Sequence, residues 1–237
     1  MVKAVFFDWS NTLARYKPTR EELHSQVLRE FGIELPPEKI MPSLLVADRD
    51  YLAENARSPV LKRSPEEQLK VYTLYQNTVL AGAGIKVAPD ILLRILKRME
   101  QSYDGITFAL FEDVLPLLKT LKERKFILGL LTNLDTSVDR DVKRICSELG
   151  LEPYLDFVVT SGEVGVDKPK PPIFLAALQR TGVDASEAVH VGDQYDLDVI
   201  GARGVGITPV LLDRYDFYPE VSDCLRIHSL TELPEYL

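Results

Sequence analysis

The chain has 237 residues, of which 46% are hydrophobic and 27% charged, a balance typical of a globular protein that buries a sizeable core. Lysine and arginine total 28 against 36 for aspartate and glutamate, and the resulting charge of −8 argues against a broad nucleic-acid-binding surface. Cys146 and Cys224 stand far apart and indicate neither a zinc cluster nor a disulfide framework. No apolar run approaches the roughly 18 residues of a membrane span, so we expect a cytoplasmic protein with no membrane partner.

Residues 2–7 are a short apolar run that stops abruptly at the polar residues 8–12. This pattern predicts a first, buried parallel strand. Residues 18–102 differ in character, because their apolar residues recur at helical spacing and no strand-like run interrupts them. We therefore expect an all-helical insert after the first strand.

Helix starts within the insert are marked by two pairs with capping-box spacing, Thr19 with Glu22 and Ser64 with Glu67. A further helix is expected from Pro89 onward. Residues 38–54 are also expected to be helical, although Pro42 obscures the residue at which that helix begins.

After residue 105 strand-like and helical segments alternate, which predicts βαβ units and a parallel sheet. The expected strands cover residues 126–131, 157–160, 188–191 and 208–212, and the expected helices cover residues 114–122, 138–149, 173–180 and 197–203. Ligands bind at the carboxyl ends of the strands in such folds, so the polar residues placed there are the candidate site.

Four of these places carry polar residues: Asp8 to Thr12, Thr132 with Asn133, Lys168, and Asp193 with Asp198. Carboxylates gathered at one edge repel one another unless a cation lies between them, and oxygen ligands suit Mg²⁺. Once the metal and Lys168 neutralise the local charge, a phosphoryl group can approach Asp8, and the Thr132 hydroxyl with loop N–H groups would hold its oxygens. Asp8 could then attack phosphorus and form an aspartyl intermediate.

Each residue taken alone has a simpler interpretation. An aspartate that ends a strand usually belongs to a turn or a helix cap, and Lys168 beside prolines is typical of a surface loop. His190 is expected to be a core strand residue. The order and spacing of the four groups together favour a shared site.

The segments VFFDWSNTL, FILGLLTN, VDKPKPPIF and HVGDQYDLDVIGA, in this order, resemble the four motifs of the haloacid dehalogenase superfamily, in the branch with a helical cap after the first strand. The resemblance implies an α/β core with a Rossmann-like doubly wound parallel sheet, formed by residues 1–15 and 106–237. It also implies that residues 16–105 are an all-helical cap that closes over the site and selects the substrate.

The resemblance further assigns roles to individual residues. Asp8 is the nucleophile and a ligand of Mg²⁺, and Ser10 offers its backbone carbonyl to the metal. Asp193 is a metal ligand, and Asp198 either binds the metal or supports a residue that does. The transferred group is bound by Thr132, Asn133 and Lys168, and Arg15 is a candidate substrate contact or a plain hinge residue.

One position departs from the pattern of the family's phosphatases, which carry a second aspartate two residues after the nucleophile. Ser10 stands there, and its hydroxyl has too high a pKa for general acid or base catalysis at neutral pH. We therefore expect a Mg²⁺-dependent phosphatase that acts on a small phosphorylated metabolite, with slow turnover.

Three alternatives stay open at this point. A 2-haloacid dehalogenase also lacks the second aspartate, but the intact pair Gly192-Asp193 disfavours it. A phosphonatase would use a Schiff-base lysine from the insert, where Lys39, Lys62, Lys70 and Lys86 are the candidates. The last alternative is a noncatalytic protein that binds phosphate or a partner.

Overall fold

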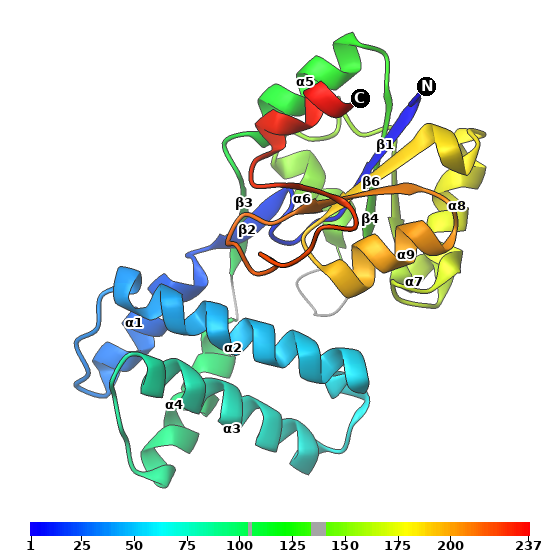
Figure 1. Cartoon of the computed structure of the whole chain (residues 1–237). Coiled ribbons are helices and arrows are strands. Elements are labelled where there is room, and N and C mark those ends of the chain that lie inside the picture. The colour runs from blue at the N-terminus through cyan, green and yellow to red at the C-terminus, as the bar shows by residue number, and fades with distance from the viewer. Residues whose placement is uncertain (104–105, 134–140) are drawn as a thin grey trace. The chain divides into compact units, whose positions relative to one another are not determined.

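The computed structural model of the chain describes residues 1–103, 106–133 and 141–237, apart from the side chains of Leu52 and Ala56. These residues form two compact units (Figure 1). The α/β unit combines Met1–Arg15 with Phe108–Leu237, and the helical unit is Tyr16–Thr107. Each is described here by itself, and the role of the helical unit as a cap stays a prediction.

The α/β unit contains a six-stranded sheet in the order β5-β4-β1-β6-β7-β8. Every neighbouring pair is parallel, as the βαβ pattern predicts. The strands are β1 (Ala4–Phe7), β4 (Ile127–Thr132), β5 (Phe157–Thr160), β6 (Ala188–Gly192), β7 (Thr208–Leu212) and β8 (Leu225–Ile227). All four residues of β1 are buried, because β1 lies in the middle of the sheet between β4 and β6.

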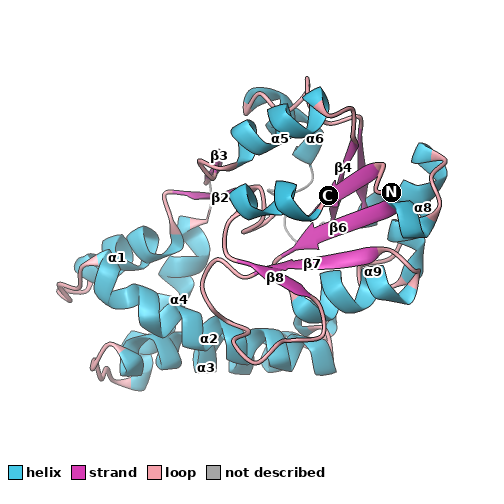
Figure 2. Cartoon of the chain, turned by 45° about the horizontal axis from the view of Figure 1, so that its top comes forward, coloured by secondary structure: helices cyan, strands magenta, loops and turns pink. Residues whose placement is uncertain are grey.

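Helices cover both faces of this sheet, with α5 and α6 on one side and α8 and α9 on the other (Figure 2). Phe6 of β1 packs with Phe174 of α8 and Ala202 of α9 in one buried cluster. The expected doubly wound α/β fold is confirmed. The helices are α5 (Val114–Glu123), α6 (Val142–Glu148), α7 (Ser161–Val164), α8 (Pro171–Thr181) and α9 (Ile200–Gly204).

The helical unit is built from α1 (Arg20–Glu30), α2 (Pro37–Arg57), α3 (Pro65–Gly82) and α4 (Pro89–Ser102). Its core includes Leu28, Leu44, Leu80 and Ile95, one from each helix. The predicted capping boxes at the starts of α1 and α3 are present. The α2 helix begins at Pro37, where a missing N–H costs nothing, and Pro42 lies inside it.

Three short strands were not predicted: β2 (Ala14–Lys17), β3 (Thr107–Leu110) and β8. Strands β2 and β3 pair in a two-stranded sheet. None of the three is longer than four residues, although β2, with the sequence ARYK, does alternate apolar and polar residues. Segments this short carry too little periodic signal to be recognised.

Two expected helices need correction. The helix expected over residues 138–149 is seen as α6, and its first three residues lie outside the described residues. The helix expected over residues 197–203 is wrong in its start, since the chain forms a π-helix over Tyr195–Val199 before α9 begins. In the part of the chain that the structure describes, no helix combines the length and apolar character needed to cross a bilayer.

Candidate active site

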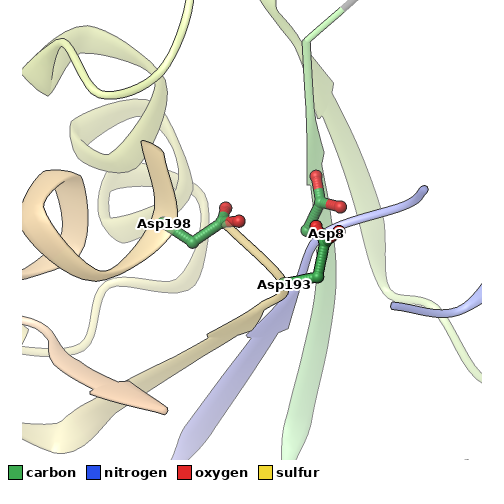
Figure 3. Close-up of side chains that lie close together, drawn as sticks. All are labelled: Asp8, Asp193 and Asp198. Atoms are coloured by element: carbon green, nitrogen blue, oxygen red, sulfur yellow. The ribbon is translucent and has the colours of Figure 1, made fainter. Parts of the chain in front are cut away.

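The strand order places three strand ends side by side, because β1 lies between β4 and β6. Asp8 directly follows β1, Asp193 directly follows β6, and Asp198 comes from the π-helix after β6. Their carboxylates gather at this edge of the sheet (Figure 3). One oxygen from each of the three carboxylates lies within 4.8 Å of the other two. The three aspartates predicted to share a site are therefore brought together.

Lys168 lies between two of these carboxylates, with its side chain almost completely buried. Its Nζ donates hydrogen bonds to Asp8 Oδ1 at 2.5 Å, to Asp198 Oδ1 at 2.7 Å and to the backbone carbonyl of Leu131 at 3.0 Å. These contacts use all three donors of the ammonium group. Lys168 is thus a part of the aspartate cluster and not an exposed loop residue.

The loop that carries Lys168 is attached to the end of β4 through Asn133. Lys168 N donates to Asn133 Oδ1 at 2.7 Å, and Asn133 Nδ2 donates to the carbonyl of Lys168 at 3.3 Å. Thr132 is buried beside it, and its hydroxyl donates to the carbonyl of Asn133 at 3.2 Å. The structure therefore brings Thr132, Asn133 and Lys168 together. The side-chain amide of Asn133 is hydrogen-bonded to backbone groups of Lys168.

Asp198 differs from the other two aspartates because both of its oxygens accept hydrogen bonds. Oδ1 contacts Lys168 and also His190 Nε2, the latter at 2.9 Å, and Oδ2 accepts from the backbone N–H of Gln194 at 3.1 Å. By contrast, Asp8 Oδ2 and Asp193 Oδ1 are buried and accept no hydrogen bond from any residue that the structure describes. The free oxygens of the cluster belong to Asp8 and Asp193.

The electrostatics of the cluster follow from burial and from the one lysine. Burial raises the pKa of Asp8 although Lys168 opposes the shift, and burial with the charges of Asp8 and Asp198 raises the pKa of Asp193 well above its usual value. Burial would also raise the pKa of Asp198, but the charge of Lys168 and the hydrogen bond from His190 outweigh it and lower that pKa. One cation does not neutralise three carboxylates.

The donor set fits a hard divalent cation. Two buried carboxylate oxygens without a hydrogen-bond partner among the described residues, one on Asp8 and one on Asp193, face a region of excess negative charge. Magnesium and calcium both prefer oxygen ligands of this type. The raised pKa values of Asp8 and Asp193 mean that their charged forms are disfavoured in this environment. A bound cation would stabilise those charged forms.

Two predicted site residues lie apart from the cluster's contacts. Ser10 forms an isolated bridge with Ala14, and within the described residues its hydroxyl makes no hydrogen bond to the three aspartates. Arg15 is exposed, and its guanidinium lies over the ring of Phe111, 5.4 Å from the centroid. The structure places Arg15 in a cation–π contact, and its role toward a substrate stays a prediction.

Asn11 and His190 contact the aspartates, a role that the sequence did not predict for either residue. Asn11 adopts a left-handed backbone conformation with φ of 56°, which asparagine tolerates better than most residues, and its Nδ2 donates to Asp193 Oδ2 at 3.3 Å. His190 is a core strand residue, as expected, but it also contacts Asp198. It stands two residues before Gly192, so both lie on the same face of β6.

Comparison with known proteins identifies the family of this chain. A family model described as haloacid dehalogenase-like hydrolase matches residues 2–206. The chain belongs to this family. The glyceraldehyde 3-phosphate phosphatase of Methanopyrus kandleri is 32% identical over 224 residues, which cover 90% of this chain and 85% of that protein.

Two solved structures extend the likeness to haloacid dehalogenase-like hydrolases over almost the whole chain. A HAD phosphatase from Thermococcus onnurineus is 26% identical with a TM-score of 0.56, covering 99% of this chain and 97% of that chain. A 2-haloacid dehalogenase from Pseudomonas syringae is 27% identical with a TM-score of 0.54 and the same coverage of both chains.

Proposed function

We propose that the protein is a Mg²⁺-dependent phosphatase that acts on a small phosphorylated metabolite through an aspartyl phosphate on Asp8. The observation that carries the proposal is a pair of buried oxygens, Asp8 Oδ2 and Asp193 Oδ1, that accept no hydrogen bond within the described residues and lie in the cluster that contains the Lys168 ammonium. A dehalogenase that attacks carbon needs no metal and therefore no such second carboxylate. The phosphatases among the relatives support the same conclusion.

Magnesium would be held by Asp8, Asp193 and the backbone carbonyl of Ser10. We assign Asp198 a supporting role, because both of its oxygens already hold Lys168, His190 and the Gln194 N–H. When bound, the ion neutralises the carboxylates and draws negative charge from the phosphoryl oxygens.

The chemical steps then fall to residues of this chain. A carboxylate oxygen of Asp8 attacks phosphorus, the new O–P bond forms, and the bond from phosphorus to the substrate oxygen breaks with its electrons leaving on that oxygen. Lys168 and Thr132 stabilise the charge on the transferred group. Water then attacks phosphorus, its proton passes to solvent, and the carboxylate of Asp8 is released with inorganic phosphate.

Ser10 determines how fast these steps run. The leaving oxygen needs a proton, and the attacking water must lose one, yet a serine hydroxyl performs neither task well at neutral pH. We propose that both protons are exchanged with solvent instead. The enzyme should therefore favour substrates with stable leaving groups and should accumulate its aspartyl phosphate.

We propose that the helical unit is the cap that selects the substrate. A cap of this size would admit small molecules more readily than a folded protein. Glyceraldehyde 3-phosphate is the first compound to test, because it is the substrate in the name of a relative that aligns with 90% of this chain.

The test measures phosphate release from an aryl phosphate and from glyceraldehyde 3-phosphate, with Mg²⁺ or with EDTA, for the wild type and Asp8→Asn. Release that requires Mg²⁺ and disappears in the variant supports the proposal. Absence of release from either compound and from a panel of small phosphate esters would contradict it. Tight phosphate binding in that case would instead support a noncatalytic protein.

A 2-haloacid dehalogenase is the second candidate, favoured by Ser10 and by the similarity to the Pseudomonas syringae enzyme. It predicts chloride release from 2-chloropropionate that persists in EDTA. The phosphonatase alternative is the less favoured one, since Lys39, Lys62, Lys70 and Lys86 are exposed in the helical unit. A Schiff-base lysine needs a lowered pKa, which burial or a second cation provides.

A further inference from the structure

Arg214 connects the loop after Asp8 to a fixed point on the α/β unit. Its Nε donates to the carbonyl of Asn11 at 3.1 Å, and its Nη2 donates to the carbonyl of Thr12 at 2.9 Å. These are the third and fourth residues after the proposed nucleophile. The Arg214 side chain is 10% exposed, so these hydrogen bonds are largely shielded from water.

The guanidinium of Arg214 is itself held in place from two sides. It forms a bidentate ion pair with Asp113, with contacts of 2.8 and 2.9 Å, and its Cζ lies 4.0 Å from the centroid of the Phe111 ring. Asp113 also accepts hydrogen bonds from the Ser229 hydroxyl and the Leu230 N–H. The planar fork of an arginine is suited to such simultaneous contacts, and a lysine is not.

Asp113 remains ionised as the anchor of this arrangement. Burial would raise the pKa of Asp113, but the hydrogen bond and charge of Arg214, with the N–H of Leu230, lower it below its usual value. The anchor and the loop are about 100 residues apart in sequence, yet both belong to the α/β unit.

One of the two loop carbonyls that accept hydrogen bonds from Arg214 belongs to Asn11, and the side chain of Asn11 contacts Asp193. Asn11 has a positive φ of 56°, a conformation that costs free energy in a residue other than glycine and persists where the surroundings enforce it. With its backbone fixed, the Asn11 amide donates to Asp193 Oδ2 and leaves Oδ1 free. The orientation of Asp193 therefore depends on Arg214 through one intervening residue.

We propose that Arg214 is a positioning residue of the metal site: anchored on Asp113, it fixes the Asn11 backbone so that the Asn11 amide turns Asp193 Oδ1 toward the cation. This inference rests on the proposed function, since it takes Asp193 as a Mg²⁺ ligand. Partners behind metal ligands commonly change metal affinity or activity by about 10- to 100-fold when they are removed. We expect an effect of that size here.

The test compares Arg214→Met, Arg214→Lys and Asn11→Ala with Arg226→Met as the matched control. Arg226 also pairs with a buried aspartate, Asp213, at 2.9 Å, and its hydrogen bonds within the described residues go to Asp213 and Asp216 and not to the loop after Asp8. Mg²⁺ affinity of the intact chain is measured by calorimetry without substrate, urea unfolding reports stability, and kcat and KM are measured at saturating Mg²⁺.

We expect Arg214→Met and Asn11→Ala each to weaken Mg²⁺ binding about 10-fold or more, and the double variant to weaken it no more than either alone. Arg214→Lys keeps the positive charge but should still bind Mg²⁺ more weakly than the wild type. Its change in log Kd should be more than half of the change in Arg214→Met. Arg226→Met should lose stability and keep its Mg²⁺ affinity. If Arg214→Met does not fold, the Mg²⁺ affinities of Asn11→Ala and Arg214→Lys decide the question.

A merely structural role predicts a different pattern. If Arg214→Met and Arg214→Lys bind Mg²⁺ as the wild type does while losing stability, the inference is overturned and the proposed function stands. If the wild type itself binds no Mg²⁺, the proposed function fails and the inference falls with it. These two results are distinguished by the wild-type titration alone.

Discussion

Asp198 packs so closely against Gly192 that a Cβ built on Gly192 would lie 2.1 Å from Asp198 Cγ. No side chain fits at Gly192 unless the Asp198 carboxylate moves. That carboxylate holds Lys168 and His190 in place. The glycine that ends β6 is therefore required for the geometry of the proposed active site.

Gly192→Ala should displace Asp198 and, with it, Lys168. A shift of about 1 Å in a catalytic arrangement typically costs about 100-fold in rate, and overpacking costs about 1–3 kcal/mol of stability. Gly204→Ala is the matched control, since a Cβ there meets nothing within 4 Å. Steady-state kinetics and urea unfolding of the two variants make the comparison, and equal activities would refute the account of Gly192.

Lys168→Met removes a cation that pairs with both Asp8 and Asp198. Breaking a buried ion pair on one side costs about 3–5 kcal/mol, because an unpaired buried charge is left behind, and the loss of a charge donor at the transferred group costs about 10²- to 10³-fold in rate. Lys122→Met removes an exposed pair with Asp156, worth about 0–1 kcal/mol. If the two variants unfold at the same urea concentration, the buried pair does not have the proposed role.

Ser10→Asp supplies the acid and base that the sequence lacks. A positioned general acid or base is typically worth about 10²- to 10⁴-fold, so we expect at least about a tenfold rise in kcat for an alkyl phosphate ester. Ser10→Asn, similar in size but unable to transfer a proton, should give no rise. An unchanged rate in Ser10→Asp would show that proton transfer is not the limiting feature.

His24 makes the stability of the helical unit depend on pH. It is buried, its Nδ1 donates to the carbonyl of Arg20 at 2.8 Å, and burial lowers its pKa to about 4. Between that pKa and the ordinary value near 6.5, the unfolded chain binds a proton that the folded chain does not. Stability is therefore full above about pH 6.5 and falls toward pH 4, by roughly 3 kcal/mol in all.

Urea unfolding followed by circular dichroism between pH 4 and 7.5 measures this dependence. His24→Gln should flatten the slope, whereas His228→Gln, which replaces an exposed histidine, should leave it unchanged. A wild-type slope that survives in His24→Gln would assign the effect to other groups.

The sequence was sufficient to predict five of the six strands of the sheet and the assembly of the aspartates. The apolar runs that precede Asp8, Thr132 and Gly192 predict parallel strands with polar residues at their carboxyl ends. The structure shows that these three strands are neighbours. The motif order added Lys168, which the structure places between Asp8 and Asp198. Local sequence patterns and the spacing of the family's motifs are therefore enough to predict these strands and these site residues.

Other features depend on contacts that local sequence does not encode. The pairing of Asp113 with Arg214 joins residues about 100 positions apart, and nothing near either residue indicates the other. The left-handed conformation of Asn11 and the π-helix that carries Asp198 are set by the tertiary contacts that they make. The engaged oxygens of Asp198, which give it a supporting role, follow from the same three-dimensional arrangement.

The central claim is that Asp8 carries the phosphoryl group, and acid quenching tests it most directly. The enzyme is mixed with Mg²⁺ and an aryl phosphate, quenched during turnover, digested and examined by mass spectrometry. We predict one phosphoryl group on the peptide that contains Asp8, removed by hydroxylamine and absent in Asp8→Asn. Turnover without this adduct, or an adduct that persists in Asp8→Asn, would contradict the mechanism.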